Sequence, residues 1–381
     1  MRFIHTADWH LGRIFHGVHL TDDQDHVLRQ FLDLVRDVRP DAVLIAGDIY
    51  DRAVPPPDAV VLLDEVLSKL TELRVPVAMI AGNHDSPDRL GFGARLFESH
   101  GLHVSCNLSS QRRPLVLDDA YGRVHIHMLP FADPPQVREH LGDDTVHNHA
   151  RAMEALIEQA RARQPRGERS VLMAHATVVG ARTSDSERPL GAFPGTSAIE
   201  SSKLAGFDYV ALGHLHTPQV IDGRIHYPGS PLKYSFGEAE EIKAVSVVEM
   251  DALGRVTIDA VPLSPRREVR KVRGHLSDLL ANDDGKRRED FVAAVLYDDG
   301  AVLDPIGRLR EIYPNILHIE RLALDLPGAI NPPTDHRKRT HLDLFKDFFN
   351  EVTGAPLTED QELAMAALVE GLDREDREVS P

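Results

Sequence analysis

The sequence has 381 residues, 42% of them hydrophobic, and a formal net charge of −17 at pH 7. This length and hydrophobic content suffice for a sizeable core and predict two or three domains. The charge argues against a surface that binds nucleic acid everywhere through lysine and arginine, and the single cysteine, Cys106, excludes a disulfide framework or a thiolate metal cluster.

The first part of the chain alternates predicted strands and helices. Residues 2–7 predict a strand, and a helix follows from Thr21, where the segment TDDQ has the form of a capping box. The apolar run at 41–46 predicts a buried strand, three prolines open a helix near residue 57, and a third strand precedes the segment GNHD at 82–85. Two strand–helix–strand units in a row predict a layered α/β fold whose strands share one direction.

The same alternation continues beyond residue 120. Residues 124–131 and the segments SVLMAHAT and YVALGHLH predict strands, and residues 146–163 predict a helix. Shorter strands at RIHYPGS, KAVSVVEM and RVTIDAVPL predict a meander that closes this part. The composition becomes more charged after Pro265, and PGAINPPTDHRKRT predicts a linker. We therefore expect a main domain at 1–265, a smaller α+β capping domain at 266–335 and a pair of helices at 336–381.

The C-terminal residues predict two short amphipathic helices, the second of which opens with the capping-box pattern TEDQ at 358–361. Two short helices bury little apolar surface against each other, so their apolar stripe needs a partner. That partner is either the core of this chain or another protein. The stripe consists of Leu342, Phe345, Phe348, Phe349, Val352, Leu363, Met365, Leu368 and Leu372.

Polar residues follow five of the predicted strands at the point where each strand ends. The carboxyl ends of parallel strands lie at one edge of a sheet, where ligands bind, so we expect these side chains to meet. Any one of them could be a turn or capping residue, but the arrival of all of them at one edge indicates a site. They are Asp8, His10, Asp48, Asn83, His84, His175, His214 and His216.

The side chains of this set are carboxylates, imidazoles and one amide, without a thiolate. Such a donor set suits Mn²⁺ or Fe²⁺, tolerates Zn²⁺ and is too rich in nitrogen for a typical Mg²⁺ or Ca²⁺ site. Eight candidates are too many for one ion and suit two ions that share a carboxylate. Paired ions stabilise both the attacking and the leaving oxygen in phosphoryl displacement, so the set predicts phosphoester chemistry.

In the order DxH, GDxxD, GNHD, a lone histidine and GHLH, the motifs resemble those of the calcineurin-like metallophosphoesterases. Within that family, HTADWHLG, GDIYDR, SDSER followed by AFPG, and PGSPLKYSFGE resemble the SbcD-type nucleases, which are subunits of bacterial SbcC–SbcD DNA repair complexes. The catalytic motifs cover residues 1 to about 265, and the likeness beyond them is looser. The resemblance implies a layered metallophosphoesterase fold of β-sheets flanked by helices.

The resemblance also implies a role for each motif residue. Two ions, Mn²⁺ or in the cell Fe²⁺ or Mg²⁺, would share Asp48. The other ligands would be Asp8, His10 and His216 for one ion, and Asn83, His175 and His214 for the other. His84 would be the catalytic histidine, which interacts with the scissile phosphate and helps to protonate the leaving oxygen. Asp51 and Asp85 would orient imidazoles, although some nuclease relatives carry histidine at the position of Asp51.

Three features favour DNA over a small phosphate ester as the substrate. The loop after the first motif offers Arg13, Phe15 and His16 near the metals, and a basic stretch opens the second domain. That stretch, which could equally be a charged surface strand, comprises Arg266, Arg267, Arg270, Lys271 and Arg273. The apolar tail is the third feature, because in the resembled family it docks onto the coiled-coil root of an SbcC-type ATPase.

The leading hypothesis is a metal-dependent nuclease for double-stranded DNA ends and hairpins in repair, recombination and replication. The resemblance implies 3′–5′ exonuclease and endonuclease activity, and a homodimer within a heterotetramer that contains the ATPase. The alternatives are a small-substrate phosphodiesterase or phosphatase of the same fold, and a scaffold with a vestigial site, which the complete ligand set opposes. We expect a soluble, cytoplasmic protein, since no signal peptide or membrane span is predicted.

Overall fold

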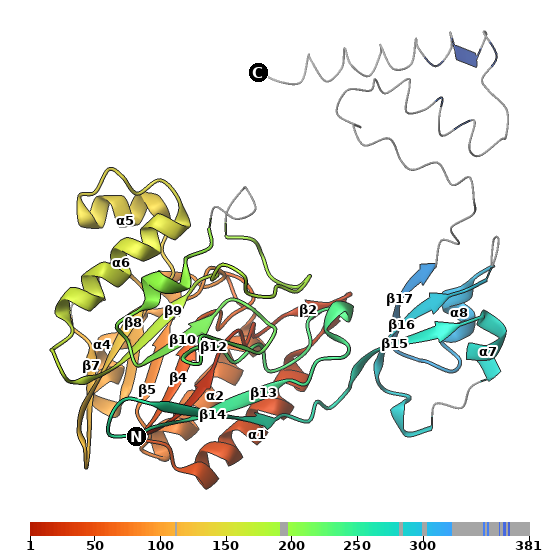
Figure 1. Cartoon of the computed structure of the whole chain (residues 1–381). Coiled ribbons are helices and arrows are strands. Elements are labelled where there is room, and N and C mark those ends of the chain that lie inside the picture. The colour runs from red at the N-terminus through yellow and green to blue at the C-terminus, as the bar shows by residue number, and fades with distance from the viewer. Residues whose placement is uncertain are drawn as a thin grey trace. The chain divides into compact units, whose positions relative to one another are not determined.

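The computed structural model describes residues 1–110, 113–190, 197–281, 285–298 and 303–321, together with residues 346, 349, 358, 361, 362 and 365 (Figure 1). Contacts within the chain group it into two units, Met1–Leu322 and Ala323–Pro381. In the part of the chain that the structure describes, no helix has the length and apolarity needed to cross a membrane.

The first of two six-stranded sheets has the order β14-β13-β1-β4-β5-β6. Its parallel strands are β1 (Arg2–Thr6), β4 (Ala42–Ala46), β5 (Val77–Ile80) and β6 (Leu102–Ser105). Strands β13 (Ala244–Met250) and β14 (Val256–Pro262) complete it in antiparallel pairing. The strands expected from the first part of the sequence therefore lie side by side, and their carboxyl ends share one edge.

The second sheet has the order β11-β12-β10-β9-β8-β7. Strands β8 (Gly122–Leu129), β9 (Arg169–His175), β10 (Tyr209–Gly213) and β12 (Ile225–Tyr227) run parallel. The two edge strands, β7 (Leu115–Asp119) and β11 (Gln219–Ile221), are antiparallel to their neighbours. The parallel centre of this sheet again places several carboxyl strand ends together.

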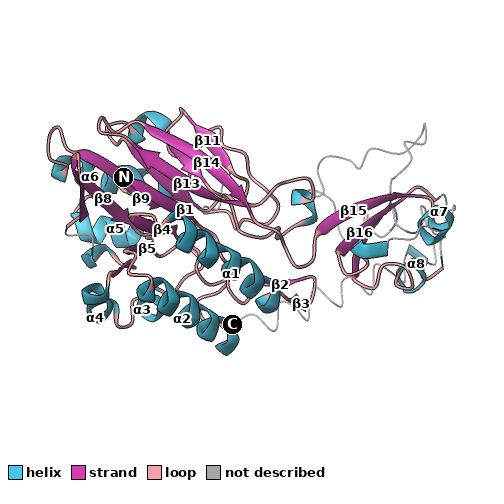
Figure 2. Ribbon diagram, turned by 90° about the horizontal axis from the view of Figure 1, so that it is seen from below, coloured by secondary structure: helices cyan, strands magenta, loops and turns pink. Residues whose placement is uncertain are grey.

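The two sheets pack face to face and helices cover their outer faces. Buried residues such as Phe3 and Leu44 of the first sheet meet Met173 and Tyr209 of the second in one apolar cluster. Helices α1 (Thr21–Val38) and α2 (Pro57–Glu72) pack on the first sheet (Figure 2), and α5 (Pro134–Leu141) and α6 (His149–Arg163) pack on the second. The expected layered α/β fold of sheets flanked by helices is confirmed.

Two details of the sequence prediction were wrong. The predicted meander does not form, because β13 and β14 pair beside β1 in the first sheet while β12 lies in the second. Strand-like segments do not reveal which sheet edge they will join, since the pairing is decided by distant residues. The expected capping box at Thr21 is also absent: Leu20 is the N-cap without a side-chain hydrogen bond, and the Thr21 hydroxyl donates to Asp58 at 2.7 Å.

A third, three-stranded sheet follows β14. Strands β15 (Val269–Gly274), β16 (Phe291–Leu296) and β17 (Ile316–Arg321) are parallel, and helices α7 (Leu276–Ala281) and α8 (Pro305–Leu309) lie between them in the chain. The mixture of helices and strands expected here takes the form of two βαβ units with a small core of its own. Other short elements are β2 (Ile14–Phe15), β3 (Val18–His19), α3 (Pro87–Leu90), α4 (Ala94–Phe97) and 3₁₀ turns at Glu98–His100, Leu108–Ser110, Ser201–Leu204, Phe236–Glu238 and Gly285–Arg287.

In the second unit the expected capping box at Thr358 is confirmed. The Thr358 amide donates to Oε1 of Gln361 at 2.9 Å, and the Gln361 amide donates to Oγ1 of Thr358 at 3.4 Å. Phe349 and Met365 of the predicted apolar stripe are helical and half-buried. The other members of the stripe, and the predicted linker, lie outside the described residues.

Candidate metal centre

The loops that follow β1 and β4 lie against each other and carry the first two motifs. The Asp8 amide donates to the Gly47 carbonyl and the His10 amide to the Asp48 carbonyl, both at 3.0 Å. The backbone is left-handed at Asp8 (φ 56°), His10 (φ 47°) and Asp48 (φ 50°), and φ is 100° at His214. A positive φ at a non-glycine residue costs roughly 1–3 kcal/mol and is concentrated at functional sites, where the surroundings hold it.

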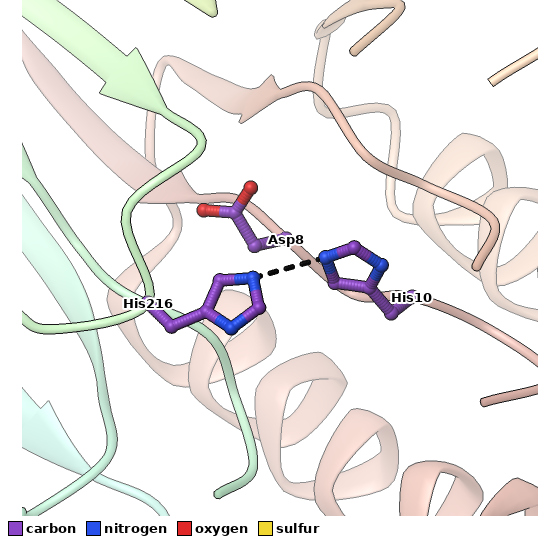
Figure 3. Close-up of side chains that lie close together, drawn as sticks. All are labelled: Asp8, His10 and His216. Atoms are coloured by element: carbon purple, nitrogen blue, oxygen red, sulfur yellow. Dashed lines mark hydrogen bonds between the residues drawn. The ribbon is translucent and has the colours of Figure 1, made fainter. Parts of the chain in front are cut away.

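One cluster of predicted ligands consists of Asp8, His10 and His216, whose ligand atoms all lie within 4.8 Å of one another (Figure 3). The Nε2 atoms of the two imidazoles are 3.0 Å apart. Asp8 and His10 follow β1 of the first sheet, whereas His216 follows β10 of the second. The cluster therefore forms only because the two sheets face each other.

A second cluster adjoins the first and consists of Asp48, His175 and His214. Oδ2 of Asp48 lies 3.4 Å from Nε2 of His175 and 3.6 Å from Nε2 of His10, so this carboxylate lies between the two clusters. Asn83 Oδ1 is 3.0 Å from the same nitrogen of His175. The structure thus brings together every residue that the sequence predicted as a ligand.

His84 lies beside both clusters and is 8% exposed. Its amide donates to Oδ1 of Asp48 at 2.9 Å, and Nε2 of its ring lies 4.0 Å from Oδ2 of the same carboxylate. Nδ1 lies 2.7 Å from the carbonyl oxygen of Asp51, which can only accept. Nδ1 therefore carries a hydrogen, and Nε2 is the ring nitrogen that faces the clusters.

Three imidazoles of the site favour the neutral form. Burial lowers the pKa of His10, lowers that of His216 well below its ordinary value, and lowers that of His214 to about 3, with neighbouring His175 adding to the last effect. A neutral imidazole keeps a lone pair on one nitrogen, which is the form that binds metal ions.

The carboxylates give the site a strong preference for a positive charge. Burial raises the pKa of Asp8 well above its ordinary value, and the nearby Asp48 carboxylate adds to the increase. Burial lowers the pKa of His175, but Asp48 and Asp8 outweigh this effect and raise it to about 9. The two buried carboxylates thus draw a proton onto His175, in a position where a metal cation would offset the same negative potential.

The residues present fit a metal ion on structural grounds. Oδ2 of Asp8 is fully buried and has no hydrogen-bond partner among the described residues, so an ion would satisfy an atom that the protein leaves unpaired. Two glycines keep the cradle open: a Cβ at Gly82 would lie 2.1 Å from Oδ1 of Asp48, and one at Gly47 would lie 2.3 Å from Nδ1 of His175. Any larger residue there would displace a candidate ligand.

Of the two carboxylates expected to orient imidazoles, only Asp51 contacts one. Its Oδ1 lies 3.4 Å from Nδ1 of His10. Asp85 instead accepts hydrogen bonds from the amides of Ile49, Tyr50 and Gly82, at 2.9 to 3.1 Å, so the prediction of an imidazole partner for Asp85 was wrong. Asp85 ties the loop after β4 to the loop after β5, and burial together with Asp48 raises its pKa to about 7.

Several residues outside the predicted set of site residues also surround the clusters. Gln24 of α1 accepts from the Gly12 amide at 3.0 Å and donates to the His10 carbonyl at 2.7 Å, which fixes the loop after β1. The others are Ser186, Glu187, Glu238 and Lys243, which surround His216. The motifs SDSER and SFGE contain three of these four residues, so the signal was present in the sequence without an assigned role.

The predicted DNA contacts in the loop after β1 are mostly turned inward. Phe15 is 3% exposed and packs against Phe236 and Phe291, so the prediction that its ring is available to DNA was wrong. Arg13 lies 3.3 Å from Oδ1 of Asp51 and stacks over the Tyr234 ring. His16 is exposed, beside Phe236 and His318.

The basic stretch at the start of the third sheet is paired with acidic residues of the chain. Arg266 lies 3.4 Å from Asp22, Arg267 forms a two-pronged pair with Asp23, and Arg270 lies 2.9 Å from Asp290. Lys271 lies 3.6 Å from Glu320. These contacts give the stretch a structural role, and its contact with DNA stays a prediction.

Replacing Phe15 by alanine is expected to lower the free energy of unfolding by about 3–5 kcal/mol, because removal of the buried aromatic ring leaves a cavity in the core. Denaturant unfolding of the full chain measures this loss. Ile14→Ala is the matched control, since the neighbouring Ile14 is 40% exposed and its truncation should cost little. A Phe15→Ala variant of unchanged stability would contradict the assignment of Phe15 to the core.

The chain is similar in structure to a dimetal phosphatase from Danio rerio, with 17% identity, 69% of this chain and 99% of that chain covered, and a TM-score of 0.39. A second similar structure is TT1561 of Thermus thermophilus, with 13% identity, coverage of 68% and 98%, and a TM-score of 0.37.

The calcineurin-like phosphoesterase family matches residues 1–218, which is more than half of the chain. The SbcD_C family, described as the type 5 capsule protein repressor C-terminal domain, matches residues 265–353. The His and Asp clusters of the first domain fit a two-metal site for phosphoester hydrolysis, and an SbcD_C domain follows it. The chain belongs to the calcineurin-like phosphoesterase family.

Proposed function

We propose that the chain is a metal-dependent nuclease that cleaves double-stranded DNA ends and hairpins, as a subunit of an SbcC–SbcD-type complex in DNA repair, recombination and replication. One observation carries the proposal: a complete metallophosphoesterase cluster and an SbcD_C domain occur in the same chain. The proposal includes 3′–5′ exonuclease and endonuclease activity, and a homodimer within the complex.

In this proposal the two clusters would hold two Mn²⁺ ions, or Fe²⁺ or Mg²⁺ in the cell, and Asp48 would be a ligand shared by both sites. The ligands of one ion would be Asp8, His10 and His216, and those of the other Asn83, His175 and His214. When bound, two such ions lower the pKa of a water molecule and stabilise negative charge on the attacking and leaving oxygens of a phosphodiester.

The proposed contribution of His84 is to hold and transfer a proton. Its Nδ1–H is fixed by the Asp51 carbonyl, so the ring presents Nε2 to the space beside Asp48. As an imidazolium the ring carries a hydrogen on both nitrogens, and Nε2 can donate it to the leaving oxygen of the phosphodiester. The contact between the His84 amide and Asp48 keeps the ring beside the clusters.

The activity can be tested on the purified full chain with Mn²⁺, an end-labelled DNA duplex and a small chromogenic phosphodiester. Release of nucleotides from the duplex, abolished by a metal chelator, is the expected result. Hydrolysis of the small ester alone would instead identify a small-substrate phosphodiesterase. Inactivity toward both substrates, with both ions bound, would identify a scaffold.

We also propose that residues 336–381 form the surface that binds the coiled coil of an SbcC-type ATPase, and that the chain divides at 265 and 335. Deletion of 336–381 is expected to abolish binding to that ATPase and to spare Mn²⁺-dependent cleavage. Gel filtration of the mixture measures binding, and the cleavage assay serves as the control. Thermal unfolding of the truncated chain at a much lower temperature would show instead that the apolar stripe belongs to the core.

A further inference from the structure

His216 differs from two neighbouring histidines in the group that orients its ring. Nδ1 of His175 lies 2.9 Å from the Ala46 carbonyl oxygen, and Nδ1 of His84 lies 2.7 Å from that of Asp51, so both rings are held by the main chain. Nδ1 of His216 instead contacts the hydroxyl of Ser186, a side chain from a loop far away in the sequence. The orientation of His216 therefore depends on side chains that can be altered without changing the main chain.

The direction of the hydrogen bonds follows from the next residue. Oγ of Ser186 lies 2.6 Å from Oε1 of Glu238, which is fully buried. A carboxylate only accepts, so the single hydroxyl hydrogen of Ser186 is donated to Glu238. The serine oxygen must then accept from Nδ1–H of His216. This leaves the lone pair of His216 on Nε2, which points at His10 in the first cluster.

A buried cation completes the arrangement. Nζ of Lys243 lies 2.7 Å from Oε2 of Glu238 and donates to the His216 carbonyl oxygen, also at 2.7 Å. Lys243 is 5% exposed. Glu187 accepts from the His216 amide at 2.8 Å, so His216 is fixed at its amide, its carbonyl and its ring. Burying a charged pair is costly unless its hydrogen bonds are satisfied. The buried pair of Glu238 and Lys243 satisfies part of its hydrogen bonding through contacts that hold His216.

We propose that Ser186, Glu238 and Lys243 are positioning residues that form a buried relay. The relay holds His216 as its Nδ1–H tautomer and makes the lone pair on Nε2 more basic. This selectively raises the metal affinity of the Asp8, His10 and His216 cluster. A hydrogen bond from the distal ring nitrogen to a carboxylate, here through a hydroxyl, is a known way of increasing the basicity of a histidine ligand. The inference rests on the proposed function only in that this cluster binds a metal ion.

The first test is Mn²⁺ binding to the full chain, measured by titration calorimetry. We expect two ions to bind the native chain, and Ser186→Ala to weaken one of the two sites by about 10–100-fold while the other keeps its affinity. Glu238→Gln, which retains the shape of the side chain and removes its charge, should weaken the same site. Ser235→Ala is the matched control, because Ser235 donates to the same oxygen of Glu238 at 3.0 Å and makes no hydrogen bond to His216.

The second test needs no metal. In the metal-free chain labelled with ¹⁵N-histidine, nuclear magnetic resonance should show His216 as the Nδ1–H tautomer, identified by its loss in His216→Gln. Ser186→Ala should shift the ring toward the Nε2–H tautomer, and Ser186→Thr, which keeps the hydroxyl, should restore it.

Each outcome bears on the relay or on the metal site. A folded Ser186→Ala variant with native affinities at both sites and an unchanged tautomer would overturn the relay, while two bound ions would still support the proposed function. A native chain that binds no ion would refute the metal site, and the tautomer would then decide the relay by itself. If Ser186→Ala fails to fold, Glu238→Gln gives the decision in the calorimetry: native affinity at both sites would overturn the relay.

Discussion

Replacing His84 by alanine is expected to lower phosphodiester cleavage by about 10²–10⁴-fold, the usual contribution of a positioned acid or base, with both ions still bound. The His84 ring faces the clusters through Nε2, whereas the hydrogen bond of this residue to Asp48 is made by its backbone amide, which alanine keeps. The loss should therefore appear in the rate of the bound enzyme. Single-turnover cleavage at saturating Mn²⁺, together with metal quantification by mass spectrometry, measures both quantities.

The control for this variant is His26→Ala, which removes an exposed imidazole of α1 and should leave cleavage unchanged. Two results would contradict the proposed role of His84. Native cleavage by His84→Ala would show that no proton passes through this ring. A loss of one bound ion in the same variant would show instead that His84 is a metal ligand. This alternative is worth testing because the ligand atoms of His84, His10 and Asp48 also lie within 4.8 Å of one another.

Replacing Asp48 by asparagine is expected to lower the metal affinity of both sites together by at least ~100-fold. Removing a residue that only orients a ligand costs up to about 100-fold in affinity, and a shared ligand should cost at least as much. Asparagine keeps an oxygen for the His84 amide, 2.9 Å from Oδ1, but removes the negative charge between the clusters. Ions bound per chain should fall from two toward none at limiting Mn²⁺, and cleavage should fall with them.

Metal quantification and calorimetry on Asp48→Asn measure this loss. Asp33→Asn is the matched control, because Asp33 is an exposed carboxylate that pairs with Arg36 on α1. Two ions bound to Asp48→Asn with native affinity would mean that the carboxylate is not shared. Loss of one ion alone would assign Asp48 to a single cluster. Either result would remove the shared carboxylate, but not the second ion, from the proposed mechanism.

The meeting of the candidate ligands could be predicted because each follows an apolar run that had to be a buried strand. Asp48, just after β4, and His175, the last residue of β9, are examples, and the direction of parallel strands places such residues at one edge. The capping box at Thr358 forms as predicted, whereas the same pattern at Thr21 does not, because the Thr21 hydroxyl donates to Asp58 on another helix.

Other features depend on contacts between distant segments. Phe15 follows a polar loop and looked available to DNA, but Phe236 and Phe291 bury it. Asp85 lies next to candidate ligands, yet its carboxylate binds backbone amides. Neither outcome can be obtained from spacing along the chain, because burial is decided by whichever segments pack against a residue.

By itself the sequence determined the layered α/β class, the strands and the set of donors for a metal centre, since hydrophobic periodicity and residue chemistry are properties of short segments. Only the tertiary structure decided that the strands divide between two facing sheets, so that Asp8 and His10 come from one and His216 from the other. It also decided that Ser186 reaches Nδ1 of His216. Both depend on pairing and packing between segments far apart in the chain, where many alternatives share the same local pattern and only the complete core selects one.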